Sequence, residues 1–72
     1  MAKTVEELVQ IAAAGGGFTI DAKSYSTEEL ISIAAAASTR GSRINILNAS
    51  EKTTRDLISI AAAGGGCVIF EL

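Results

Sequence analysis

Apolar residues recur at helical spacing in three segments of the chain. Each segment has a Leu, then Val or Ile, an Ile two residues after that, and at least three alanines. These runs occupy residues 8–14, 30–36 and 57–63. Apolar positions three and four residues apart are typical of a helix with one buried face. The pattern predicts helices over residues 5–14, 27–38 and 54–63.

A hydroxyl residue precedes each predicted helix, and an acid follows it three residues later. The pairs are Thr4 with Glu7, Ser26 with Glu29, and Thr53 with Asp56. This is the spacing of a capping box, in which the hydroxyl and the carboxylate each accept a hydrogen bond from a free backbone N–H. Because Asp is shorter than Glu, we expect the third box to be the weakest.

Short apolar runs after the helices predict strands at residues 18–21, 43–48 and 67–71. Glycine triplets at residues 15–17 and 64–66 end the first and third helices, since glycine enters the left-handed conformation without a Cβ penalty. The first two strands alternate apolar with polar residues, which indicates one buried face. The third is nearly all apolar, which is typical of a strand covered on both faces.

The chain therefore consists of three helix–strand units, which begin 22 and 27 residues apart. Units that stack in the same sense give parallel strands in the order 1-2-3, joined by right-handed connections. We predict a single α/β domain over residues 1–72. It has a small parallel three-stranded sheet, with the helices mainly on one face.

The second strand contains Ile44 and Ile46, followed by Asn48. Leucine-rich repeats have a Leu-x-Leu pair and an Asn three residues further on, in units of 20–29 residues that give a strand and a helix. The chain resembles this family in its period, although Asn48 comes one residue earlier than the family pattern places it. The resemblance implies a binding scaffold without catalysis.

The predicted topology leaves one face of the sheet uncovered, and side chains alternate between the two faces. The side chains expected to face the helices are Phe18, Ile20, Ile44, Cys67 and Ile69. The other face then carries an apolar patch of Leu47, Val68, Phe70 and Leu72. Such a patch marks an interface, unless the topology differs and a helix crosses to cover it.

The small size of the chain favours self-association. It has 72 residues, with two Phe, one Tyr and no Trp. Domains of this size usually need a disulfide, a metal or a partner subunit as a supplement, unless the core packs unusually well. With Cys67 as the one cysteine and no histidine, we expect no intrachain disulfide and no metal site. We therefore expect a homo-oligomer, formed through the sheet face or edge that carries residues 67–71.

The sequence gives little support for a catalytic site. No histidine is available to activate Cys67 as a nucleophile. The glycine triplets follow helices, where carbonyls are exposed, whereas a phosphate loop precedes a helix. We expect no enzyme and no cofactor. The predicted function is a non-enzymatic protein-interaction or oligomerisation module, whose partner is a second copy or another protein.

Four of the six basic residues, Arg40, Arg43, Lys52 and Arg55, lie within 16 positions. They suggest an alternative function, a small anion- or nucleic-acid-binding regulator. However, the first two and the last two belong to opposite ends of the second strand in a parallel unit, and the net charge is −2. We therefore do not expect nucleic acid to be the partner.

The sequence also bears on location. Its longest uncharged stretch, residues 57–70, has 14 residues, fewer than the roughly 18 that a membrane helix needs. Two acids, Glu6 and Glu7, stand where a signal peptide requires an apolar run. A lone free thiol suits a reducing compartment. We expect a cytoplasmic protein that does not contact a membrane.

Overall fold

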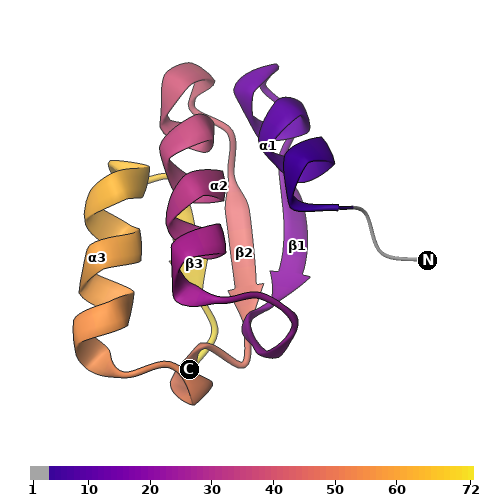
Figure 1. Ribbon diagram of the computed structural model, residues 1–72. Coiled ribbons are helices and arrows are strands. Elements are labelled where there is room, and N and C mark those ends of the chain that lie inside the picture. Colours follow the sequence, from indigo (N-terminus) through magenta and orange to yellow (C-terminus); the bar gives the residue numbers. More distant parts are fainter. Residues whose placement is uncertain (1–3) are drawn as a thin grey trace.

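The structure, a computed structural model, describes residues 4–72 and contains three αβ units in succession (Figure 1). The helices are α1 (Val5–Ala13), α2 (Thr27–Arg40) and α3 (Thr54–Gly64). The strands are β1 (Phe18–Asp21), β2 (Ile44–Leu47) and β3 (Val68–Phe70). Single turns of 3-10 helix, η1 (Ala22–Ser24) and η2 (Ala49–Glu51), follow β1 and β2. All bounds lie within two residues of those predicted from the sequence.

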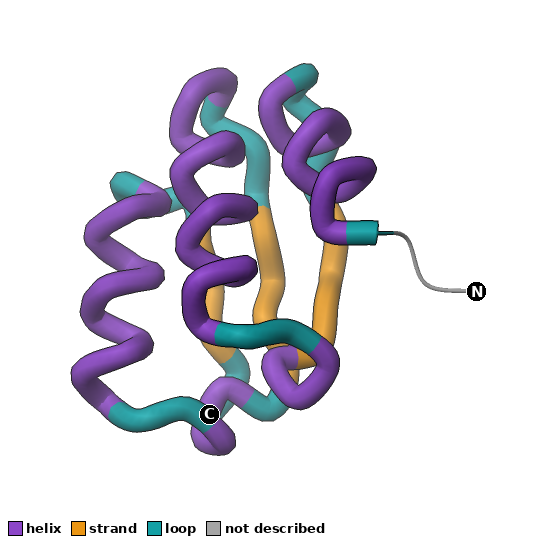
Figure 2. Tube along the Cα trace, viewed as in Figure 1, coloured by secondary structure: helices purple, strands orange, loops and turns teal. Residues whose placement is uncertain are grey.

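The three strands are parallel and lie in the order β1-β2-β3. All three helices cover the same face of this sheet, with α2 between α1 and α3 (Figure 2). None of the helices in residues 4–72 crosses to the other face. The predicted α/β class, strand order and one-sided helix layer are therefore confirmed.

The helix caps follow the predicted spacing. Thr4 accepts a hydrogen bond from the Glu7 N–H, and the Glu7 carboxylate accepts one from the Thr4 N–H. The second helix has the same reciprocal pair. In the third, Thr53 accepts from the Asp56 N–H, but the Asp56 carboxylate accepts from the Thr27 hydroxyl at 3.2 Å. The shorter acid thus ties α3 to α2.

The core lies between the helices and the sheet. Its largest fully buried side chains are Leu30, Ile33, Ile44, Ile46 and Ile60. Four of these belong to the second unit, which has a neighbour on both sides, and the fifth is on α3.

One buried hydroxyl joins the first two units. Among the described residues, Ser42 is the buried polar side chain, and it donates to the carbonyl of Ala12 at 2.7 Å. Ser42 lies just before β2 and Ala12 lies near the end of α1, so this hydrogen bond fixes the start of β2 against the first helix.

Two glycine positions are required by the backbone. A Cβ on Gly17 would lie 2.5 Å from the carbonyl oxygen of Arg43, so β1 and β2 can approach there only without a side chain. Gly65 ends α3 in the left-handed region at φ 55°. Residues with a Cβ are strained in that conformation.

The prediction of which side chains of the third strand face the helices was wrong. Val68 pairs with Ile44, and Phe70 pairs with Ile46, so both side chains face the helices and pack partly buried against the core. Ile69 pairs with Asn45 and lies on the uncovered face, where it is 43% exposed.

The physical reason is that β3 begins one residue later, relative to its glycine triplet, than β1 does. α1 ends before its glycine triplet and β1 starts directly after it, whereas α3 includes Gly64 and β3 starts one residue after its triplet. A shift of one residue moves every side chain of a strand to the other face.

Substitutions at two adjacent positions of β3 test which of its side chains face the helices. Phe70→Ala removes a ring that packs against the core and should lower the free energy of unfolding by about 2–4 kcal/mol. Ile69→Ala, on the uncovered face, should lower it by about 1 kcal/mol or less. Urea denaturation measures both, and a larger loss for Ile69→Ala than for Phe70→Ala would contradict the observed facing.

Candidate interaction surfaces

One side of each helix faces the next unit. A Cβ on Gly64 of α3 would lie 3.4 Å from the Cβ of Ala34, which places Ala34 on the side of α2 that faces α3. Ile31 precedes Ala34 by three residues and shares its side of the helix. We call this the forward side of a helix.

The forward side is covered in α1 and α2 and open in α3. Ala12 and Ala34 are buried, whereas the equivalent Ala61 is exposed. Val9 and Ile31 are half-buried, whereas the equivalent Ile58 is 64% exposed. No helix follows α3 within the described residues. Thr54, Ile58 and Ala61 therefore form an exposed C-terminal end face.

The opposite, backward side of each helix faces the preceding unit and has the reverse pattern. Ile11 of α1 is 38% exposed, whereas the equivalent Ile33 and Ile60 are 1% and 0% exposed. Ala14 is likewise exposed, while its equivalents Ala36 and Ala63 are half-buried. No helix precedes α1 in residues 4–72, so Ile11 and Ala14 form an N-terminal end face.

Each end face lies at the same end of the stack as an outer strand of the sheet, β1 or β3, whose outer edge is unpaired within the described residues. Ile44 N–H donates to the Cys67 carbonyl, and Glu71 N–H donates to the Ile46 carbonyl. Because backbone groups alternate in direction along a strand, those of Val68 and Phe70 point away from β2. At the other edge of the sheet, β1 is likewise paired only on its β2 side in the described part of the chain. Open edges of this kind are templates for pairing with another strand.

The uncovered face of the sheet is mixed in character. By register, the strand residues on this face are Thr19, Asp21, Asn45, Leu47 and Ile69. Two of the five are apolar, and Asn45 donates to the Thr19 hydroxyl across β1 and β2 at 3.5 Å. This face does not form the continuous apolar patch that the sequence predicted.

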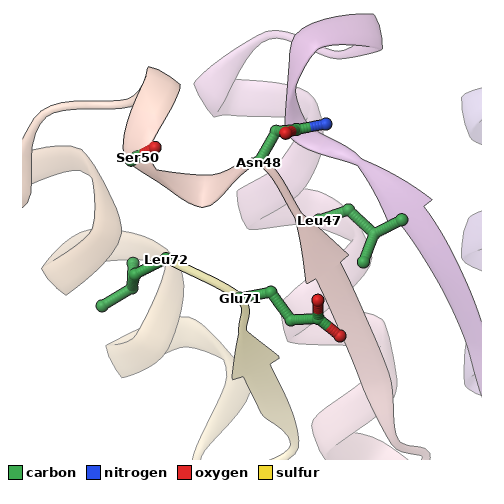
Figure 3. A pocket seen from close by; sticks show the side chains of 5 residues that line it. All are labelled: Leu47, Asn48, Ser50, Glu71 and Leu72. Atoms are coloured by element: carbon green, nitrogen blue, oxygen red, sulfur yellow. The ribbon is translucent and has the colours of Figure 1, made fainter.

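The predicted interface residues Leu47, Val68, Phe70 and Leu72 do not form one patch. Val68 and Phe70 face the helices. Leu47 and Leu72 line an open depression of about 520 Å³ at the carboxyl ends of β2 and β3, with Asn48, Ser50 and Glu71 (Figure 3). Leu72 is 82% exposed and its side chain points away from Leu47 (Figure 3).

A small polar network joins the turns after β1 and β2. Asn48, in the left-handed region at φ 56°, donates to the Asp21 carboxylate at 2.9 Å. The other carboxylate oxygen of Asp21 accepts from the Lys23 N–H at 2.8 Å. The hydrogen bonds from Lys23 and Asn48 hold the pKa of Asp21 below its ordinary value of 3.8.

The four basic residues of the alternative prediction lie at two ends of the molecule. Arg40 ends α2 and Arg43 precedes β2, and both are exposed at the end of the sheet where the strands begin. Lys52 and Arg55 flank the start of α3, at the end where the strands finish. Figure 1 shows these two ends of the elements on opposite sides of the molecule. The Lys52 ammonium donates to the carbonyl of Tyr25 at 2.9 Å. The structure therefore offers no single basic patch from these residues.

No group of three metal-ligating side chains occurs within residues 4–72. Across that part of the chain, no helix is both long and apolar enough to cross a membrane. Comparisons with protein-family models, with curated proteins and with solved structures find no match to this chain.

The Asp21 network predicts a pH dependence of stability. A carboxyl whose pKa is depressed in the folded state stabilises the fold above its ordinary, unfolded pKa, and this contribution disappears as the pH falls through the folded pKa. Asp21→Asn should therefore flatten the loss of stability below about pH 5.

The free energy of unfolding, measured from pH 7 to pH 2, provides the test. Asn48→Gly keeps the left-handed backbone accessible and removes one of the two hydrogen bonds, so it should reproduce part of the effect. Identical pH slopes for the wild type and Asp21→Asn would contradict the assigned network.

Proposed function

We propose that this protein is a non-enzymatic protein-interaction module that self-associates through the open ends of its αβ stack. One observation carries the proposal. Ile58 is 64% exposed at a helix position that is half-buried in both preceding units. A single exposed apolar side chain is ordinary on a protein surface. Here, however, Ala61 and the open edge of β3 lie at the same end of the stack.

The distribution of polar residues supports this function. The solvent-facing positions Gln10, Ser32 and Ser59 are exposed in every unit and are polar in every unit. Terminal units of repeat proteins ordinarily have a polar outer face, which keeps them soluble. In this chain, apolar Ile58 and Ile11 stand on the outer faces instead, which favours a partner at the ends.

The non-enzymatic part of the proposal rests on the side chains available. The chain has no histidine, and Cys67 lies partly buried against the core. A nucleophile of this kind requires an adjacent base or a lowered pKa. The free thiol also favours a reducing, cytoplasmic location.

Dilution tests the proposal. Sedimentation velocity over a hundredfold concentration range should give a wild-type mass that rises above the 7.3 kDa of one chain. Ile58→Glu places a charge in the contact and should weaken association more than about tenfold. Ser59→Glu, the neighbouring solvent-facing position, adds the same charge and should associate like the wild type.

Circular dichroism establishes that both variants remain folded. A wild type that stays monomeric at the highest concentration would contradict the proposed function.

A further inference from the structure

We infer that the partner is a second copy of this chain stacked head to tail, with the C-terminal end face of one copy against the N-terminal end face of the next. This inference rests on the proposed function and adds the identity of the partner and the direction of stacking.

The two end faces are the two halves of a contact that already exists within the chain. Between α2 and α3, the forward side with Ile31 and Ala34 packs toward the backward side that carries Ile60. The same contact relates α1 to α2, whose Ile33 is buried in turn. Each interior contact thus joins a forward side to a backward side.

The two end faces carry the equivalents of three residues of this contact, Ile31, Ala34 and Ile60. The forward side of α3 presents Ile58 and Ala61, the equivalents of Ile31 and Ala34. The backward side of α1 presents Ile11, the equivalent of Ile60. A second copy stacked head to tail therefore covers both exposed isoleucines with apolar residues of the type that the interior units use.

One polar contact joins α2 to α3 across the helices. The Thr27 hydroxyl of α2 donates to the Asp56 carboxylate of α3 at 3.2 Å. The equivalent positions at the two ends hold Thr54 and Glu7. The Glu7 carboxylate already accepts a hydrogen bond from the Thr4 N–H, so the contact with Thr27 is particular to Asp56, and the inference rests on the apolar positions.

The unpaired edges of β1 and β3 also favour head-to-tail stacking. All strand pairs within the chain are parallel. Val68 and Phe70 of β3 are in register with Ile44 and Ile46 of β2. The backbone groups of Ile44 and Ile46 form hydrogen bonds with the strand that follows β2. The β1 edge of a second copy would continue the sheet as a fourth parallel strand. A symmetric contact between two C-terminal end faces would need a new, antiparallel pairing of β3 with β3.

Head-to-tail stacking leaves one free end of each kind on every open assembly. Such a contact extends to open chains unless its rotation closes a ring, whereas a symmetric contact stops at the dimer. The direction of stacking is therefore measurable by blocking one end at a time.

Two singly blocked proteins test the inference. Ile58→Glu blocks the C-terminal end face, and Ile11→Glu blocks the N-terminal end face, with Ala14→Arg as a second N-terminal block at an exposed position. Ser59→Glu and Gln10→Glu are the matched controls on the solvent side. We expect each blocked protein alone to be monomeric, and their equimolar mixture to form a 1:1 dimer that grows no further.

The possible results separate this inference from the proposed function. If Ile11→Glu and Ala14→Arg still dimerise alone while Ile58→Glu does not, the contact is symmetric, which overturns the head-to-tail inference and leaves the proposed function standing. A mixture that remains monomeric while the wild type associates also overturns it. A monomeric wild type overturns the proposed function itself.

Discussion

Lateral contact between neighbouring units is the interaction on which the rest of this structure depends. One short helix over one short strand has too little apolar surface to bury alone, so a repeat unit acquires its core from its neighbours. The largest fully buried side chains are accordingly on α2, on β2 and on the side of α3 that faces α2. Ile11 and Ile58 stand at the two places where a unit has a neighbour on one side only, and both are exposed.

Small residues make this lateral contact close. Alanine and glycine at the helix contacts, such as Ala34 against Gly64, let neighbouring backbones approach, and Gly17 does the same beside β2. Each small side chain also buries little area, so it contributes little hydrophobic stabilisation. A stack of three such units therefore has a modest core, and added lateral contact at its ends would contribute a large share of its stability. This links the composition of the chain to its proposed association.

Much of the fold could be predicted from the repeat, because capping residues and apolar spacing fix where helices begin and which side they bury. The facing of β3 could not be predicted. Val68, Ile69 and Phe70 are all apolar, so no polar residue marks the solvent side, and the two glycine triplets look alike although α3 extends into its own. The exposed residues of the two end faces could not be predicted either. Ile58 and Ile31 occur in the same local sequence, Leu-Ile-Ser-Ile-Ala-Ala-Ala, and only their order in the stack makes one exposed.

Joining two copies in one chain tests most directly whether lateral stacking carries the stability. Leu72 fused to Met1 leaves four residues between Glu71 and Thr4, as many as separate Asp21 from Ser26. If the end faces stack, the tandem protein should unfold in one transition at a higher urea midpoint, with a denaturant slope about twice that of one copy. Ile58→Glu in the first copy should remove this gain. A tandem protein with the midpoint and slope of the single copy would contradict continuous stacking.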